Sequence, residues 1–276
     1  MKKRELKYRI NWQDAWKEMR NERIRKLRVT YDEDFLKKSA EDFSNRYKWN
    51  DYESGRGVVN LLGDILNKDL EVLEIGPGPG TLTIPLSERV KNIVCLEASP
   101  VNIQILKRNL QEKEITNFKL INKYWEKAKI EDRFDLVICS HFLWMVEDLE
   151  KHLDRMEKFS KRYCVIVQPC GRDEVTKKAF EDICGERYTG QFEPDAEYFP
   201  YLILREWSRF VDVSYLEYSF KLNLEEGIRY IASYLGKFIE VDEQAADRIR
   251  KFLLAEVGES WMVLDKAAVM RWEPIR

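Results

Sequence analysis

The chain has 276 residues, 44% of them hydrophobic, so it can bury a substantial core as one elaborated domain or two small ones. Its 47 basic and 49 acidic residues leave a formal net charge of -2. This balance argues against a global electrostatic field that would draw the protein onto nucleic acid or an acidic membrane.

The N-terminal residues lack the roughly 7–15-residue apolar core of a secretory signal, and no run of about 18 apolar residues predicts a membrane span. None of the five cysteines forms a C-x-x-C pair, and Cys95, Cys139 and Cys164 lie in apolar, strand-like runs. They are predicted to be reduced thiols that act as small hydrophobic side chains in a cytoplasmic protein. With only two histidines in the chain, no metal site is predicted.

Residues 1–66 are predicted to form an N-terminal helical cap. Residues 1–30 carry eleven Lys/Arg against four Asp/Glu, and apolar residues such as Trp12 and Trp16 recur at near-helical intervals. This pattern indicates an amphipathic helix with a basic face. A second helix leads to the segment NRYKWNDY, and a third is expected over residues 55–66.

Residues 67–170 alternate short apolar runs with amphipathic segments. The short runs are apolar on both faces, as expected for strands of a parallel sheet between two layers of helices. The β-α repetition predicts an α/β, doubly wound, Rossmann-like core. Its five strands are expected at 71–76, 92–99, 117–122, 133–140 and 162–169.

Residues 171–209 break the alternation and predict an insertion after the fifth strand that caps the sheet edge. Residues 210–276 are predicted to complete the sheet with two further strands, over 211–222 and 261–274, separated by two helices. The expected fold is therefore a seven-stranded, mostly parallel sheet with helices on both faces. The insertion is rich in aromatic residues, and about two of them are expected to line a small organic pocket: Tyr188, Phe192, Tyr198, Phe199, Tyr201 and Trp207.

A cluster of glycines and prolines, GPGPG, follows the first predicted strand. Gly76, Gly78 and Gly80 allow positive φ and close approach of a ligand to the backbone. The spacing is G-x-G-x-G, whereas the dinucleotide fingerprint G-x-G-x-x-G would place its third glycine at Thr81. Glu74 lies just before the cluster, where a carboxylate would repel a pyrophosphate and attract an ammonium group.

A second carboxylate, Glu97, ends the next predicted strand, where an acidic side chain can bind both ribose hydroxyls. Two carboxylates that flank a glycine loop suit a ligand with an adenosyl ribose at one end and a cationic amino-acid group at the other. S-adenosylmethionine has both groups, which makes it the predicted cofactor.

Residues 72–106, from VLEIGPGPG to NIQIL, closely resemble motifs I and II of class I S-adenosylmethionine-dependent methyltransferases. The resemblance extends over roughly residues 40–168, and residues 133–159 are similar to the fourth-strand region of the UbiE-like, small-molecule branch. It implies that the methionine end contacts the glycine loop, the ribose contacts Glu97, and the adenine lies near Ala98, Ser99 and the segment after the third strand. The implied cofactor-binding residues are Glu74, Gly76, Pro77, Gly78, Gly80, Thr81, Glu97, Ala98, Ser99, Tyr124, Trp125, Glu126 and Ser140.

The glycine motif also resembles that of rRNA adenine dimethyltransferases, which follow the fourth strand with N-x-P-[YF]. Here that place reads SHFL, from Ser140 to Leu143, and the missing Asn and Pro argue against methylation of a base amine. His141 follows the fourth strand near the expected methyl position and is the candidate general base, or a group that orients the acceptor.

These observations predict a methyltransferase that acts on a small-molecule acceptor, with nucleic acid an unlikely partner. Two alternatives stay open. One is an RNA or protein methyltransferase that docks through the basic N-terminal helix, and the other is a regulatory protein that binds S-adenosylmethionine without turnover. The simplest role of the basic helix is a solvated face whose tryptophans pack it over the mouth of the active site.

Overall fold

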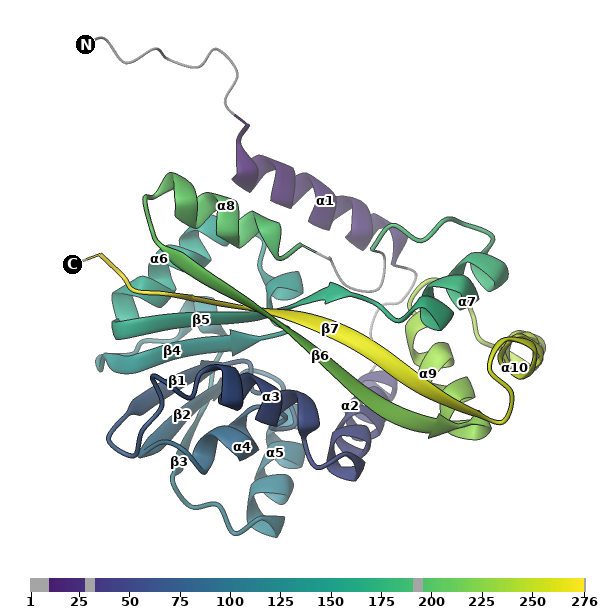
Figure 1. Cartoon of the computed structure of the whole chain (residues 1–276), viewed down its shortest axis with the longest axis horizontal. Coiled ribbons are helices and arrows are strands. Elements are labelled where there is room, and N and C mark those ends of the chain that lie inside the picture. The colour runs from purple at the N-terminus through teal and green to yellow at the C-terminus, as the bar shows by residue number, and fades with distance from the viewer. Residues whose placement is uncertain (1–9, 28–32, 191–195, 276) are drawn as a thin grey trace.

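The computed structural model describes residues 10–27, 33–190 and 196–275 (Figure 1). Within these residues, no helix is both long enough and apolar enough to cross a bilayer.

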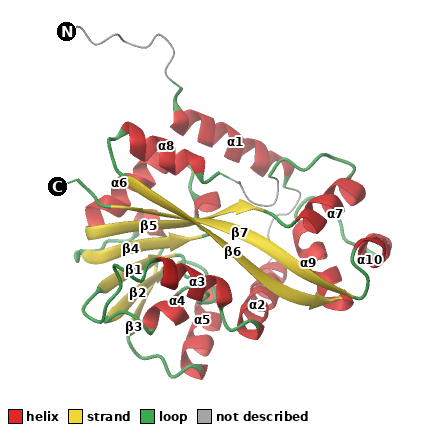
Figure 2. Cartoon of the chain, in the orientation of Figure 1, coloured by secondary structure: helices red, strands yellow, loops and turns green. Residues whose placement is uncertain are grey.

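A seven-stranded sheet runs through the molecule in the order β3-β2-β1-β4-β5-β7-β6 (Figure 2). The first five strands in this order are parallel, and β7 pairs antiparallel with both β5 and β6. The predicted fold class is thereby confirmed. The strands are β1 (Glu71–Ile75), β2 (Asn92–Glu97), β3 (Phe118–Asn122), β4 (Phe134–Ser140), β5 (Ser160–Gly171), β6 (Val211–Asn223) and β7 (Ser260–Trp272).

The strand order reverses between β1 and β4, and in open α/β sheets ligands bind outside the carboxyl ends of the strands at such a reversal. Ten helices are described around the sheet, together with single 3-10 turns at Trp125–Lys127 and Leu143–Met145. The helices are α1 (Trp12–Lys26), α2 (Glu33–Trp49), α3 (Glu53–Leu61), α4 (Thr83–Ser87), α5 (Pro100–Glu112), α6 (Leu149–Phe159), α7 (Glu174–Cys184), α8 (Tyr198–Glu206), α9 (Leu224–Leu235) and α10 (Glu243–Glu256).

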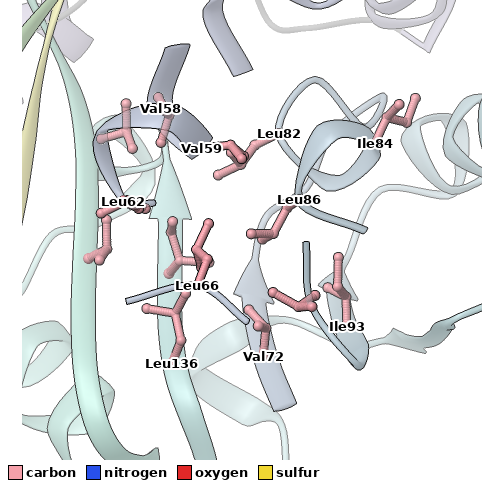
Figure 3. Close-up of a cluster of buried hydrophobic side chains, with 14 of the residues drawn as sticks. Val58, Val59, Leu62, Leu66, Val72, Leu82, Ile84, Leu86, Ile93 and Leu136 are labelled. Atoms are coloured by element: carbon pink, nitrogen blue, oxygen red, sulfur yellow. The ribbon is translucent and has the colours of Figure 1, made fainter. Parts of the chain in front are cut away.

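Alternate residues of the central strands enter two different cores, because successive strand side chains point to opposite faces. Val72 and Leu136 face a cluster completed by apolar residues of α3, α4 and α5, and Figure 3 shows Val58, Leu82 and other side chains packed around them. The opposite cluster contains the neighbouring strand residues and is covered by α1, α6 and α8. Burial of both faces explains why the strands read as continuous apolar runs.

A third core lies beyond the parallel strands, where the long β6 and β7 run toward α7, α9 and α10 (Figure 1). The 171–209 insertion does not form one cap on the sheet edge, as the sequence had suggested. Its helix α7 packs in this third core, whereas α8 packs with α1 and α6 over the second.

The basic helix α1 is anchored by its apolar and polar side chains together. Trp16 is completely buried, and its Nε1 donates to the carbonyl oxygen of Val146 at 2.9 Å. The side-chain oxygen of Gln13 accepts from the backbone N–H groups of Leu149 and Glu150, at 2.7 and 3.0 Å, and so caps the first turn of α6. The expected packing of this helix by its tryptophans is therefore confirmed for Trp16.

Candidate functional site

A cavity of about 810 Å³ opens at the carboxyl ends of β1, β2 and β4. Nearly all the site residues predicted from the sequence line it, although they come from four separate segments of the chain. The lining residues among them are Glu74, Gly76, Pro77, Gly78, Thr81, Glu97, Ala98, Ser99, Tyr124, Trp125, Glu126, Ser140 and His141.

The glycine loop has the backbone shape that its sequence predicts. Gly76, Gly78 and Gly80 have φ of 66°, 57° and 98°, which is a region that other residues rarely adopt. A Cβ on Gly76 would lie 2.4 Å from Cδ2 of Phe142, so this glycine is also required by close packing. Gly80 does not line the cavity; a Cβ there would lie 2.8 Å from Cδ1 of Leu106, on the side of the loop that packs against α5.

Glu97 ties the glycine loop to the end of β2. Its Oε2 accepts from the N–H of Gly78 at 3.1 Å, and its Oε1 accepts from the N–H of Ser99 at 2.9 Å. A carboxylate oxygen can accept more than one hydrogen bond, so both oxygens keep capacity for hydroxyl groups of a ligand in the cavity. The geometry therefore fits the ribose contact that the resemblance implies.

Glu74 is a buried carboxyl on the wall of the cavity, only 1% exposed. Its Oε2 has no hydrogen-bond partner among the described residues. Burial raises the pKa of Glu74 to about 7, the nearby Glu97 carboxylate adds to the increase, and a hydrogen bond with Thr83 opposes it. An unsatisfied buried carboxyl at a cavity wall is suited to a cationic group, as S-adenosylmethionine would supply.

The affinity for S-adenosylmethionine is expected to fall by up to about tenfold per pH unit as the pH is lowered below about 7, because binding the cation requires ionised Glu74. Calorimetry in two buffers of different ionisation enthalpy would detect the proton released on binding. Glu74→Gln should bind weakly at every pH, and a wild-type affinity that is constant from about pH 5.5 to 8 would contradict the assignment.

The stability of the ligand-free protein depends on pH in the opposite direction to the affinity. Between pH 4.5 and about 7 the folded state keeps a proton on Glu74 that the unfolded chain has lost. The contribution of this group to the free energy of unfolding therefore decreases as the pH rises through that window.

Trp125, expected to lie beside the adenine, lines the cavity, and His152 holds it in place. The indole Nε1 donates to Nδ1 of His152 at 3.0 Å, and Nε2 of His152 lies 3.8 Å from the Cys139 sulfur. Burial lowers the pKa of His152 to about 3, so the imidazole is neutral and carries its proton on Nε2. His152 also stacks on Phe142, with ring centroids 5.8 Å apart.

His152→Leu is expected to raise the KM for S-adenosylmethionine by about threefold to tenfold, because it leaves the buried indole N–H without an acceptor. The kcat should change much less, since His152 does not line the cavity. His152→Asn, which offers an amide oxygen near the position of Nδ1, should recover most of the affinity. Equal KM values for the leucine variant and the wild type, measured with both proteins folded, would show that Trp125 needs no such support.

His141 lies at the end of β4 in a constrained conformation. Its φ is 54°, its N–H donates to the carbonyl oxygen of Val167 at 2.8 Å, and Nδ1 is 2.9 Å from the Ser140 hydroxyl oxygen. Left-handed backbone is costly for a residue other than glycine and is common at functional sites. These contacts direct the ring onto the cavity wall, where the sequence had predicted it.

The aromatic residues of the insertion do not line this cavity. Phe199 packs edge-on against Trp16 at 5.6 Å between ring centroids, Tyr201 and Trp207 pack in the same core, and Tyr188 packs in the third core. Tyr198 is 45% exposed and also lies away from the cavity. Tyr188 and Tyr198 instead line a separate cavity of about 480 Å³ between α1 and α7. Phe192 lies outside the described residues.

Side chains that the sequence reading overlooked complete the cavity. They come from α2, α3 and β6, and include Phe43, Tyr47, Val58, Leu216 and Tyr218. Phe43 and Tyr47 are one helical turn apart, which places them on the same face of α2. This spacing is a weak signal of a shared role, but it gives no indication of which distant segment the face contacts.

Residues 66–198 match the family model described as a methyltransferase domain. The probable ribosomal RNA small subunit methyltransferase A of Methanosphaera stadtmanae is 34% identical over 87 residues, which are 29% of this chain and 31% of that protein. The release factor glutamine methyltransferase of Francisella tularensis is 32% identical over 87 residues, 30% of this chain and 31% of that protein. The chain thus spans about a third of the length of these curated relatives.

The fold is similar to that of the YcgJ protein from Bacillus subtilis, with a TM-score of 0.55. That similarity covers 80% of this chain and 98% of the YcgJ chain at 13% sequence identity. At so low an identity the likeness concerns the fold alone.

Proposed function

Residues 66–198 are a class I, S-adenosylmethionine-dependent methyltransferase domain, and on this premise we propose that the chain methylates a small-molecule acceptor, as the UbiE-like branch does. The shape of the cavity supports a small-molecule acceptor. The cavity continues from the cofactor-binding loops over apolar side chains of α2, α3 and β6. Its volume of about 810 Å³ lies high in the range of roughly 300–1,000 Å³ for small-molecule sites, which leaves room beside the cofactor.

S-adenosylmethionine supplies a methyl group on a positively charged sulfur, which leaves as a neutral thioether. The residues of the chain are proposed to align the two reactants. Glu97 holds the ribose and Glu74 binds the cationic end, while the bare backbone at Gly76 and Gly78 allows close approach. The apolar wall excludes water, so alignment and desolvation supply much of the rate enhancement. An acceptor that is protonated at neutral pH additionally needs a base.

His141 is proposed to take that proton at Nε2, since Nδ1 is bonded to Ser140. His141→Ala is expected to lower kcat by about 100-fold, the lower end of the range for general acid–base catalysis, and to remove one limb of the pH–rate profile. Affinity for S-adenosylmethionine should be nearly unchanged. Undiminished turnover with a normal pH profile would eliminate the role.

Incubation with methyl-labelled S-adenosylmethionine and fractionated cell extract tests the proposed function. Label is expected in the small-molecule fraction, with stoichiometric S-adenosylhomocysteine. Cofactor binding without S-adenosylhomocysteine formation in any fraction would instead indicate a regulatory protein.

RNA methylation is the second candidate, because several relatives that match part of the chain are named as ribosomal RNA small subunit methyltransferases. The basic helix α1 offers cations for phosphate contacts. This candidate predicts label in the RNA fraction and co-purification with RNA that weakens steeply with salt. The SHFL sequence after β4 counts against it, because it lacks the Asn and Pro of the base-amine enzymes.

A further inference from the structure

One part of the cavity has an apolar, largely aromatic lining. It is built by α2, α3, β6 and β7, and the side chains that define it are Phe43, Tyr47, Val58, Leu216, Tyr218 and Ala267. Tyr47 and Tyr218 are 6% and 4% exposed, so most of their surface is already fixed by packing. Such rigid aromatic walls favour a ligand with a flat or otherwise apolar body.

Charges are distributed unevenly along the cavity. The carboxylates among its described lining residues are Glu74, Glu97 and Glu126, and all three belong to the segments at the ends of β1, β2 and β3. The cation Lys123 lies at that same end, beside Tyr124. Of the other lining cations, Arg23 comes from α1 and Lys237 from the segment after α9.

A second cation, Arg46, lies directly behind the aromatic wall. Its guanidinium carbon is 4.6 Å from the ring centre of Tyr230, 5.6 Å from that of Phe220 and 5.8 Å from that of Phe43, which lines the cavity. Within the described part of the chain, no carboxylate forms an ion pair with Arg46. Arg46 also shares a side-chain hydrogen bond with Tyr234. Neither this bond nor the aromatic faces supply a negative charge, so the guanidinium favours an anion nearby.

The nearest buried carboxylate is engaged elsewhere. Asp265 accepts from Arg172 at 2.9 Å in a pair that is almost completely buried, so its charge is committed to Arg172. The ring of Tyr234 lies 4.9 Å from the Arg172 guanidinium and 5.2 Å from the Lys237 ammonium. Tyr234 also packs on Tyr230, at 5.0 Å between ring centres, so this pair of rings links the contacts of Lys237 and Arg46.

We propose that the methyl acceptor is an organic acid: an apolar, preferably aromatic body with one anionic group such as a carboxylate. The body lies between Phe43, Tyr47 and Tyr218, and the anionic group points toward Lys237 and Arg46. The reactive atom then faces His141 and the glycine loop. This inference rests on the proposed function, because it assigns the acceptor part of the same cavity.

Two fluorescent probes with the same ring system test the inference. One is 1-anilinonaphthalene-8-sulfonate, and the other is N-phenyl-1-naphthylamine, which lacks the sulfonate. Binding is measured to the full chain with saturating S-adenosylhomocysteine, so that the cofactor end is filled. The anionic probe is expected to bind about tenfold more tightly or better, the effect of one favourable charge contact.

Lys237→Met should reduce this preference to about threefold or less, and Arg46→Met should reduce it as well. The control Lys251→Met replaces an exposed lysine of α10 that pairs with Asp247, and it should keep the wild-type preference. Thermal melting identifies any variant that fails to fold, in which case the other variant decides. Equal binding of the two probes by the wild type, or a preference that survives in the folded variants, overturns the inference.

A failure of the inference is distinguishable from a failure of the proposed function. If S-adenosylhomocysteine binds and label enters neutral small molecules, only the organic-acid assignment fails. If the cofactor product gives no heat of binding, the proposed function itself fails. Retention of the labelled product on an anion exchanger supports both.

Discussion

Glu97→Ala is expected to weaken S-adenosylmethionine binding by roughly 100-fold or more. The carboxylate accepts from the N–H groups of Gly78 and Ser99, and the same oxygens are proposed to bind the ribose. Charge-assisted hydrogen bonds of this kind contribute about 1.5–3 kcal/mol each, and the loss of two corresponds to a factor of roughly 100. Isothermal titration calorimetry measures the change directly.

A series of substitutions separates charge from general damage. Glu97→Gln keeps one acceptor oxygen and should fall between the alanine variant and the wild type. Glu131→Ala removes an exposed carboxylate in the loop before β4 and should bind as the wild type does. An affinity of Glu97→Ala within about threefold of the wild type would mean that this residue supports the loop without holding the ligand.

Gly76→Ala is expected to lower the free energy of unfolding by about 2–4 kcal/mol. Part of the cost, about 1 kcal/mol, comes from a positive φ at a residue with a Cβ. The larger part comes from overpacking, since the new Cβ would lie 2.4 Å from Cδ2 of Phe142. Phe142 in turn stacks on His152 and has little room to move. Denaturant titration of the ligand-free protein gives the value.

Gly185→Ala is the matched control. Gly185 ends α7 with a φ of 71°, close to the 66° of Gly76, but a Cβ there would meet nothing within 4 Å. Its expected cost is therefore the backbone part alone, about 1 kcal/mol. If the two variants lost equal stability, the contact between Gly76 and Phe142 would have no energetic consequence.

The sequence predicted those parts of the site that depend on local pattern. Strands that are apolar on both faces indicate a parallel sheet, and a glycine loop after the first strand marks its binding edge. Glu74 and Glu97 were found because strand ends are visible in the apolar periodicity. Sheet topology alone brings the carboxyl ends of β1, β2 and β4 together, so no distant side-chain contact had to be guessed.

The acceptor part could not be predicted because it depends on contacts between distant segments. Phe43 and Tyr218 line one cavity although 175 positions separate them in the sequence. The many aromatic residues of the 171–209 insertion suggested that the insertion lines the acceptor pocket. Their rings instead pack α8 and α7 against the rest of the protein. Asn109 is a similar case: its side-chain N–H groups donate to the Pro79 carbonyl and the Ser44 hydroxyl, at 2.8 and 2.9 Å. An asparagine within a helix gives no sign that it will join α2 to the glycine loop.

The anchoring of α1 shows that the folding unit is larger than the segment shared with the methyltransferase family. A fragment of residues 66–198 would lack Trp16 and β7, which cover apolar side chains of the second core and pair along β5. Its sheet would end at β5 in an edge without a partner strand. The Val146 carbonyl and the first turn of α6 would also lose their hydrogen bonds with Trp16 and Gln13. The match to the family model begins at residue 66, whereas the unit that we expect to fold on its own includes α1.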